Sequence, residues 1–597
     1  MPTIMTNLNR REFLRTSIRQ GLVGAAVPLA ALRAQPSPSK RISREAELTG
    51  HLGEWNFVGS NDWTQDDQGI FYSPIWNQCI VRKDGTDFLK REDFAYPFAE
   101  VLAETDVNVE FRTFAWSLET VGLVFRSQDS VRYYYVEVGD RGVADQYAVR
   151  ILIRDSTGYR RELASTFITY GHRPDNWYQI MESRNWEEWA KITPGWTKLR
   201  VQAQRNVIRV SVADQQILEV NDTTYSAGRV GLLARGPAQF RKLSVSGERA
   251  TLPKRWKDSG DRPDYFYPWP DAEKRFGDNQ SYPGILRMAN GDLGLWMGVT
   301  GDPHRPDDVL LVWSRDQGKT WADPMLFKKR AGLGQPGYFF GYPDGRLSCL
   351  YATTYDWETK SGGVRVAYSQ DRGKTWGAPE PLLVSGKPLN VYGDHSRIGP
   401  YSPIMRLSDG TLLQFYYEVK LTSDGKVVDD EQRRDRSLLI RSLDDGRTWE
   451  GPFYIAPDNY DSNECMGVER SDGSLISFAR TLSSPYMWMS TSQDKGKTWT
   501  KQVQSKVSGA SPILLRHSSG VLIMGSRNWG VSITTSVDDG KTWLGPTVIS
   551  VLTGMMGMVE THNGQVLIVH AEGYRVPSRI RGQFFGVNRN GTLAPAS

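Results

Sequence analysis

The sequence predicts an all-β protein in which a β-sandwich precedes a six-bladed β-propeller. Two repeats predict the propeller: an octet, Ser-x-Asp-x-Gly-(Lys/Arg)-Thr-Trp, occurs five times, and a glycine hairpin turn occurs six times. Recurrence at intervals of roughly 45–70 residues is typical of radial or stacked repeat architectures. Short strands of alternating apolar and polar residues, separated by turn residues, predict the sandwich in the first half of the chain.

Residues 1–34 are predicted to be an export signal. Arg10 and Arg11 precede an apolar segment from Gly21 to Leu32, which ends near Ala34. Twin arginines before a short, weakly apolar stretch are typical of a twin-arginine signal, and the stretch is too short to span a bilayer. A basic amphipathic N-terminus is the alternative. We expect a periplasmic or extracellular protein without membrane insertion.

Most of the positive charge lies in this segment. The formal net charge is +5, and residues 1–34 hold five arginines and one glutamate, a net of +4, which leaves about +1 for the remainder. Nucleic-acid binding therefore lacks its electrostatic basis. Cys79, Cys349 and Cys465 are odd in number and widely spaced, which suggests neither a disulfide framework nor a metal site. We expect no nucleic-acid partner, no metal and no cofactor.

Residues 46–248 are predicted to form the sandwich, of the jelly-roll kind. Apolar and polar residues alternate over 199–203, 207–212 and 230–234, as in half-buried strands. The segment from Trp196 to the strand that starts at Phe240 resembles the end of a concanavalin-like (laminin-G-type) domain. That resemblance implies either a sugar-binding or a purely structural role. Residues 249–269, rich in proline, charged and aromatic residues, are predicted to be a linker.

Residues 270–592 are predicted to form the propeller. Asn, Asp or Ser before glycine, between apolar runs, indicates a β-hairpin, and an octet follows each of the first five hairpins. One unit reads strand, glycine turn, strand, strand, octet turn, strand, which is a four-stranded blade. A seventh, divergent blade within 250–280 is the alternative. The octets begin at Ser314, Ser369, Ser442, Ser492 and Ser536, and the hairpin glycines are Gly291, Gly345, Gly410, Gly473, Gly520 and Gly564.

Each residue type in the octet has a local structural role. The aspartate can accept hydrogen bonds from a tight turn, and the glycine supplies a positive φ. The closing tryptophan is a large apolar side chain suited to packing between neighbouring sheets. Because the octets fall in outer turns, we interpret their aspartates as structural and not catalytic.

Candidate site residues lie where the innermost strands begin. Loops at that end of a propeller converge on one pocket. The residues that precede the hairpins there include Tyr282, His395, Arg397, Tyr401 and Glu464. The loops that follow the second strand of a unit add Asp302, Arg480 and Arg527.

The octets are similar to the Asp boxes (bacterial neuraminidase repeats) of sialidases over the whole predicted propeller. The resemblance implies a sialidase-like propeller with three arginines for a substrate carboxylate, an aspartate acid/base, and a tyrosine nucleophile paired with a glutamate. By the same resemblance Glu464 and Arg480 match the glutamate and the second arginine, Arg527 matches the third, and Asp302 matches the acid/base.

Two positions depart from the family pattern. Ser281-Tyr282-Pro283 stands where an Arg-Ile-Pro motif is expected, and 554–558 contains no tyrosine where the nucleophile is expected. Losing one arginine weakens a bidentate clamp on a carboxylate. His395 and Arg397 could rebuild that anion site. Either Tyr282 or Tyr401 could supply the nucleophile from another blade.

An inverting route also fits these residues. Asp302 as acid and Glu464 as base could hydrolyse a glycoside with water between carboxyl groups roughly 6.5–9.5 Å apart. We expect an exported sialidase-like glycoside hydrolase that acts on a terminal acidic sugar of a glycan. A non-catalytic carbohydrate-binding propeller, and a hydrolase or lyase of uronic-acid polysaccharides, are the alternatives.

Overall fold

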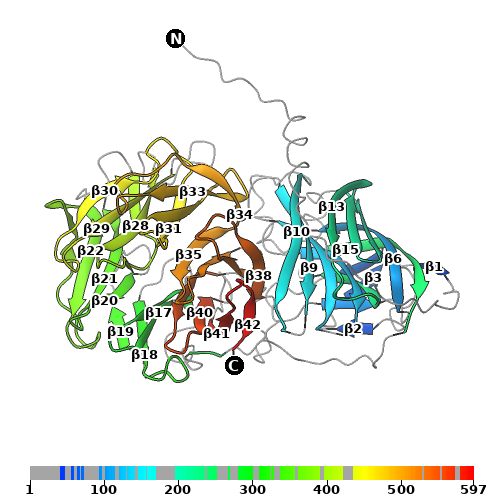
Figure 1. The fold of residues 1–597 in the computed structure, drawn as a ribbon, viewed down its shortest axis with the longest axis horizontal. Helices are drawn as coiled ribbons and strands as arrows, with labels where there is room; N and C mark the ends of the chain where they lie inside the picture. Colours follow the sequence, from blue (N-terminus) through cyan, green and yellow to red (C-terminus); the bar gives the residue numbers. More distant parts are fainter. Residues whose placement is uncertain are drawn as a thin grey trace, which may run out of the picture. The chain divides into compact units, whose positions relative to one another are not determined.

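The computed structural model describes β-strands and the turns that join them (Figure 1). In this part of the chain every regular element is a strand, so the predicted all-β class is confirmed, and no helix in it is long and apolar enough to cross a membrane. The described residues are 41–46, 56–58, 63–66, 69–72, 93–96, 101–113, 120–129, 131–140, 146–155, 157–169, 195–234, 238–251, 266–268, 280–299, 308–322, 325–328, 337–356, 361–389, 396–420, 435–527, 530–550, 554–571 and 579–596.

Two antiparallel sheets come first in the chain. Strand β12 shows why they form: its residues alternate between partly and fully buried, which places Ile208, Val210 and Val212 on one face. The first sheet has the order β13 (Gln215–Asn221), β12 (Val207–Val212), β11 (Thr197–Gln204), β6 (Leu102–Thr113), β15 (Ala238–Arg249), β4 (Gly69–Tyr72), β3 (Trp63–Asp66), with β1 (Arg41–Ala46) on β15. The second has the order β2 (Asn56–Val58), β5 (Asp93–Tyr96), β14 (Arg229–Ala234), β7 (Thr120–Ser127), β8 (Tyr133–Asp140), β9 (Gln146–Arg154), β10 (Arg160–Thr169).

The two sheets share one apolar core. Val107 and Val201 of the first sheet belong to the same buried cluster as Leu123 and Ile151 of the second. The second sheet does not end at β10. Strand β10 pairs antiparallel with β38 (Leu544–Ser550), with Arg160 opposite Val548, and Figure 1 shows the two strands side by side. Because the ladder is continuous, this strand edge is covered and not exposed.

Six four-stranded antiparallel units follow among the described residues of the second half. The first strand of each unit contacts the preceding unit, and β16 of the first contacts β39 of the sixth, which closes the ring. The units, called blades 1 to 6, are β16 (Gln280–Arg287), β17 (Leu293–Val299), β18 (Asp308–Ser314), β19 (Met325–Lys328); β20 (Tyr338–Gly341), β21 (Leu347–Asp356), β22 (Ser361–Ser369), β23 (Glu380–Pro381); β26 (Ser396–Pro400) with β27 (Met405–Arg406), β28 (Leu412–Lys420), β29 (Asp435–Ser442), β30 (Glu450–Tyr454); β31 (Asn463–Glu469), β32 (Leu475–Arg480), β33 (Tyr486–Ser492), β34 (Val503–Ser508); β35 (Ala510–Arg516), β36 (Leu522–Arg527), β37 (Val531–Ser536), β38; and β39 (Met556–Glu560), β40 (Val566–Ala571), β41 (Ile580–Val587), β42 (Leu593–Pro595). A two-stranded sheet, β24 (Leu383–Val384) and β25 (Lys387–Pro388), follows blade 2.

The octets form the turns between the third and fourth strands of blades 1 to 5. In blade 4, Asp494 accepts hydrogen bonds from the Ser492 hydroxyl at 2.9 Å and from the backbone N–H of Thr498 at 2.8 Å. The Thr498 hydroxyl donates to the same carboxylate at 2.6 Å. The indole N–H of Trp499 donates to the backbone carbonyl of Gly496 at 3.0 Å. The same contacts recur in the other four octets, so these aspartates are structural as predicted.

The octet tryptophans pack between blades. The Trp376 ring lies 5.0 Å from Phe327 of blade 1 and 5.5 Å from Phe339 of blade 2, centroid to centroid. The Trp543 ring of blade 5 lies 5.1 Å from Phe478 of blade 4. Each indole thus fills the space between its own blade and the preceding one, as predicted for a large apolar side chain.

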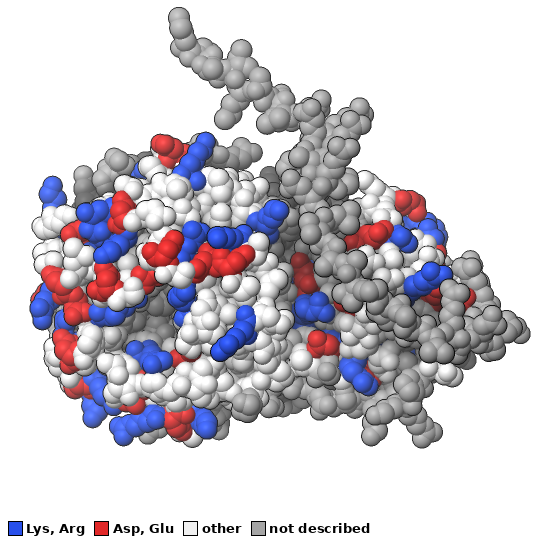
Figure 2. All heavy atoms as spheres, viewed as in Figure 1, with Lys and Arg blue, Asp and Glu red and all other residues white. Residues whose placement is uncertain are grey.

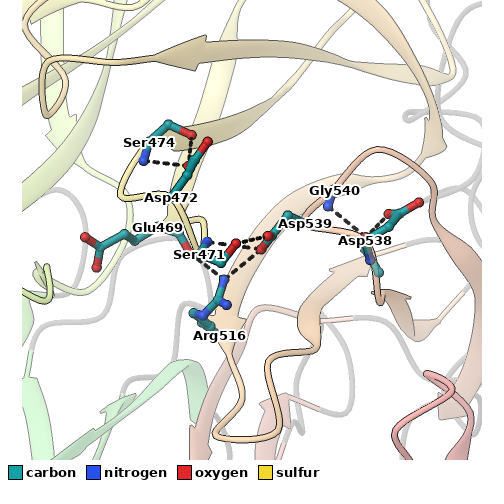
Figure 3. A network of polar contacts seen from close by, with 9 residues as sticks. Glu469, Ser471, Asp472, Ser474, Arg516, Asp538, Asp539 and Gly540 are labelled. Carbon is teal, nitrogen blue, oxygen red and sulfur yellow. Dashed lines mark hydrogen bonds and ion pairs between the residues drawn. The ribbon is translucent and has the colours of Figure 1, made fainter.

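The residue before each octet glycine connects neighbouring blades. Its φ is also positive, between 57° and 64° in the five octets. In Figure 3, Asp539 of blade 5 accepts from the backbone N–H of Ser471 in the blade 4 hairpin at 3.2 Å and from Arg516 at 2.8 Å. Lys495 reaches Asp409, and Arg372 reaches Asp292, in the same way. On the face seen in Figure 2, basic and acidic side chains are correspondingly interspersed.

Candidate functional site

One position recurs at the start of the inner strands. Tyr282, Tyr401, Glu464, Ser511 and Met555 each stand eight residues before the Asn, Asp or Ser of their hairpin, at 290, 409, 472, 519 and 563. Four of the five line a pocket of about 320 Å³, partly open to solvent. The fifth, Glu464, adjoins the pocket through its hydrogen bond with Ser511. The pocket residues are Tyr282, Pro283, Trp296, Gly337, Tyr338, Tyr401, Ser511, Ile513, Met555 and Met556.

β-Bulges turn three of these side chains out of their strands. The register shifts between Ser281 and Gly284 in blade 1, between Asn463 and Cys465 in blade 4, and between Ala510 and Ile513 in blade 5. Such an extra residue re-aims a side chain and is common near active sites.

Two of the bulge residues have left-handed backbone conformations. Tyr282 has a φ of 48° and Ser511 a φ of 54°, which costs a non-glycine residue about 1–3 kcal/mol. Strain of this kind gathers at functional sites because the surrounding fold has to maintain it. The third bulge is held differently: the Asn463 side chain accepts a hydrogen bond from the backbone N–H of Glu464 at 2.5 Å and donates to the buried Asp435.

Glu464 is the centre of a polar cluster. It is buried, with 9% of its surface exposed. Arg480 Nη1 lies 3.3 Å from its Oε1, and Arg527 Nη2 lies 3.5 Å from its Oε2. The Ser511 hydroxyl donates to Oε2 at 2.7 Å and accepts from Arg527 Nε at 2.7 Å. With two guanidinium groups and one carboxylate, the cluster carries a net charge of +1 and favours an anion.

The arginines keep Glu464 ionised. Burial alone would raise the pKa of its carboxyl group, but the charges of Arg480 and Arg527 and the hydrogen bond from Ser511 outweigh it. The pKa of Glu464 therefore lies below its ordinary value of 4.5. At neutral pH this group is a carboxylate that can accept a proton.

Part of the pocket lining is aromatic. The Trp296 and Tyr338 rings are 6.2 Å apart, and the Tyr401 and Tyr417 rings 6.1 Å apart. Burial raises the pKa of Tyr338 and Tyr401 well above the ordinary value, and the charge of Glu464 adds to the shift in both. Both phenols are therefore neutral at physiological pH. Aromatic side chains beside a cationic cluster suit a ring with one apolar face and one anionic substituent.

Asp461 organises the loop that follows Arg480. Its carboxylate accepts from the Thr481 hydroxyl at 2.5 Å and from the backbone N–H of Leu482 at 2.6 Å, and it also accepts from the Ser483 hydroxyl. Since Arg480 ends β32 immediately before this loop, these bonds hold the backbone from which its guanidinium extends.

The structure brings together three of the predicted site residues, Glu464, Arg480 and Arg527. Tyr282 and Tyr401 line the adjoining pocket. Asp302 and His395 lie outside the described residues, and only the backbone of Arg397 is described, in β26. Among the residues described, no group of three or more His, Cys, Asp or Glu side chains is placed to hold a metal ion.

Ser511, Tyr338 and Trp296 were not predicted. Ser511 carries the same signal as Glu464, because it too stands eight residues before its hairpin. A second spacing extends the pattern. Arg480 stands sixteen positions after Glu464, and Arg527 stands sixteen positions after Ser511. Tyr417 follows Tyr401 at the same distance. Ser511 was not recognised because its side chain carries neither a charge nor a phenol. Nothing comparable marks Tyr338, which is six positions before Asp344.

Known proteins resemble the second half of the chain in sequence. It matches a family described as BNR repeat-like domain in two overlapping alignments, over residues 307–511 and 364–584. A sialidase from Bacteroides fragilis (strain YCH46) is 25% identical over 311 residues, covering 44% of this chain and 53% of that sialidase. The chain thus spans about half the length of this relative.

Solved structures include sialidases among the similar folds. A leech intramolecular trans-sialidase, complexed with 2,7-anhydro-Neu5Ac, is 12% identical with a TM-score of 0.41, and the match covers 91% of this chain and 98% of that one. The NanB sialidase from Streptococcus pneumoniae is 12% identical with a TM-score of 0.41, and the match covers 82% of this chain and 96% of that one.

Proposed function

We propose that this chain, which is similar to the BNR repeat-like domain family and to a sialidase, is a glycoside hydrolase that removes a terminal acidic sugar from a glycan. The observation that carries the proposal is the contact of Glu464 with Arg480 and Arg527 beside an aromatic pocket. Two guanidinium groups can bind the carboxylate of the sugar, and the aromatic side chains can pack against its ring.

The proposed chemistry uses two carboxyl groups. Glu464, held ionised, accepts a proton from a water molecule while the water oxygen bonds to the anomeric carbon. The glycosidic bond breaks with its electron pair on the departing oxygen, and Asp302 supplies a proton to that oxygen. This direct displacement inverts the configuration at the anomeric carbon.

A tyrosine nucleophile is the alternative route. Tyr401 is buried beside the pocket and has Ser511 as a hydrogen-bond partner. Its phenol is neutral, so a neighbouring base has to take its proton as the oxygen attacks. Tyr282 occupies the corresponding position of blade 1. Attack by either phenol would form a covalent intermediate and retain the configuration. The anomer released first, followed by NMR, distinguishes the two routes.

The absence of an arginine at position 281 and of a tyrosine near Met555 favours a second candidate, a propeller that binds an acidic glycan without cleaving it. The arginine cluster and the aromatic side chains would serve recognition equally well. Uronic-acid polysaccharides carry the same carboxylate chemistry, so they belong among the ligands to be tested.

Hydrolysis of a panel of sialosides and uronides decides between these candidates. We expect the wild type to cleave at least one class, and Glu464→Gln and Asp302→Asn each to lower kcat by roughly 10²–10⁴-fold. Glu469→Gln is the matched control, because Glu469 ends the same strand and bonds Ser408 away from the pocket. Cleavage that survives both substitutions would contradict the assigned roles, and binding without cleavage would support the second candidate.

We also propose that residues 1–34 direct export through the twin-arginine route. The support is the Arg10-Arg11 pair before a short apolar stretch. Replacing both arginines by lysine should leave the protein in the cytoplasm in a fractionation experiment, whereas the unchanged sequence should give a periplasmic or secreted product. Equal export of both would contradict the proposal.

A further inference from the structure

Ser511 lies between Glu464 and Arg527, two of the three charged groups of the site. It is buried, with 2% of its surface exposed. Its hydroxyl proton goes to Glu464, and one of its lone pairs accepts from Arg527 Nε, both at 2.7 Å. A hydroxyl has one proton and two acceptor positions, so these two bonds define its orientation. The serine thereby joins residues of blades 4 and 5.

The Arg527–Glu464 separation is longer than that of two other Arg–Glu pairs in the propeller. Arg436 contacts Glu418 through two nitrogens at 3.0 and 2.6 Å, and Arg441 contacts Glu450 through two nitrogens at 2.9 and 2.8 Å. Arg527 instead approaches Glu464 no closer than 3.5 Å, with its Nε bound to Ser511. The hydroxyl occupies the place where a direct contact would otherwise form.

The backbone of Ser511 adopts a strained conformation in this arrangement. Ser511 has a φ of 54° inside a bulge, a conformation that glycine adopts without strain. A glycine here would remove the strain but also the hydroxyl. The presence of serine at such a position indicates that the hydroxyl, and not the turn, is required.

We propose that Ser511 is a positioning residue that keeps Arg527 and Glu464 from closing into a direct ion pair, so that both groups stay oriented toward the pocket. Arg527 can then bind an anionic ligand, and Glu464 can act on it. That Arg527 binds the carboxylate of a sugar rests on the proposed function, whereas the spacing of the pair does not.

The first test is structural and needs neither ligand nor activity. In a crystal structure of Ser511→Ala, Arg527 should move onto Glu464 and form a direct contact of about 2.8 Å. In Ser511→Gly, which also removes the hydroxyl but relieves the strained φ, the same direct contact should form. An unchanged separation in Ser511→Ala would overturn the proposal.

The second test measures binding of an acidic monosaccharide, free sialic acid or glucuronic acid, by calorimetry. Ser511→Ala should bind roughly tenfold or more weakly, as expected when a hydrogen bond to a charged group is lost, and Ser511→Gly, which relieves the backbone strain but has no hydroxyl, should bind as weakly. Ser526→Ala is the matched control, because Ser526 is a buried serine next to Arg527 whose hydroxyl has no partner among the described residues. Parent-like binding by the glycine variant would indicate that the backbone and not the hydroxyl matters, and would contradict the proposal.

The two tests separate this inference from the proposed function. If the wild type binds an acidic sugar without cleaving it, the hydrolase proposal fails while the Ser511 proposal is still decided by affinity. If the wild type binds neither sugar, the crystal structure of Ser511→Ala decides alone.

Discussion

Glu464 illustrates how a buried carboxylate can remain charged. An isolated ion in such a place would be neutralised, because burial disfavours the charged form. Two arginines and one hydroxyl reverse that preference here. Each of these partners also needs Glu464, since two unpaired guanidinium groups so close together would repel each other. The residues of the site are therefore coupled, and changing one alters the charge state of the others.

The lowered pKa of Glu464 predicts the acidic limit of activity. If Glu464 is the base, kcat/KM should stay constant on lowering the pH to its ordinary pKa of 4.5 and fall only below that value. The sign follows from the direction of the shift, because the carboxylate form persists to a lower pH than in a free glutamate. A pH–rate profile measures this limit, and Arg527→Met should move it upward because one compensating charge is lost. A wild-type limit well above pH 4.5 would contradict the assignment.

At the scale of elements, the octet turn and the bulge use similar backbone strain for different purposes. In the octet, the positive φ of Lys495 and Gly496 closes a turn in which Ser492 and Thr498 donate to Asp494. In the bulge, the positive φ of Ser511 sends one side chain toward the axis. The octet motif is therefore local and can be recognised in the amino-acid sequence. The bulge residue is recognisable only by its distance from the hairpin.

Asp494→Ala tests the structural role of the octet. Removing the carboxylate leaves the Thr498 N–H and the Ser492 hydroxyl without their acceptor, which should lower the free energy of unfolding by about 1–3 kcal/mol. Urea denaturation measures this loss, and KM should be unchanged because the octet is remote from the pocket. Gln493→Ala, at an exposed position of the same octet, should have little effect. An Asp494→Ala protein as stable as the parent would show that the turn holds without its aspartate.

At the scale of the whole molecule, the ring is closed by contacts of several kinds. Tryptophans fill the spaces between blades, polar residues join octets to neighbouring hairpins, and β39 meets β16. The two N-terminal sheets connect to this ring through the pairing of β10 with β38. Blade 5 thus carries Ser511 and Arg527 on its inner strands and this pairing on its outermost strand, so movement of the blade is constrained at both ends.

The octet aspartates predict a stability that falls in acid. Hydrogen bonds from their turns lower the pKa of Asp316, Asp444, Asp494 and Asp538 below 3.8 and that of Asp371 to about 2. Carboxyl groups with a lowered pKa in the folded state stabilise it above the unfolded pKa, and this contribution is lost as the pH falls through the folded value. The free energy of unfolding, measured in urea from pH 6 to pH 2, should therefore decrease mainly below about pH 4. A flat dependence would contradict this.

Turn chemistry and repeat spacing are local properties of the chain, so the all-β class and the octet turns were predictable from the amino-acid sequence, which also singled out Glu464, Arg480 and Arg527 as candidates. The contacts among these residues are a tertiary property: Ser511 bonds both Arg527 and Glu464, and Tyr401 and Tyr338 line the same pocket. The hydrogen bond between Ser511 and Glu464 joins residues 47 positions apart. Contacts of that kind depend on how the blades pack around the axis. No local sequence pattern predicts that the Ser511 hydroxyl lies 2.7 Å from the Glu464 carboxylate.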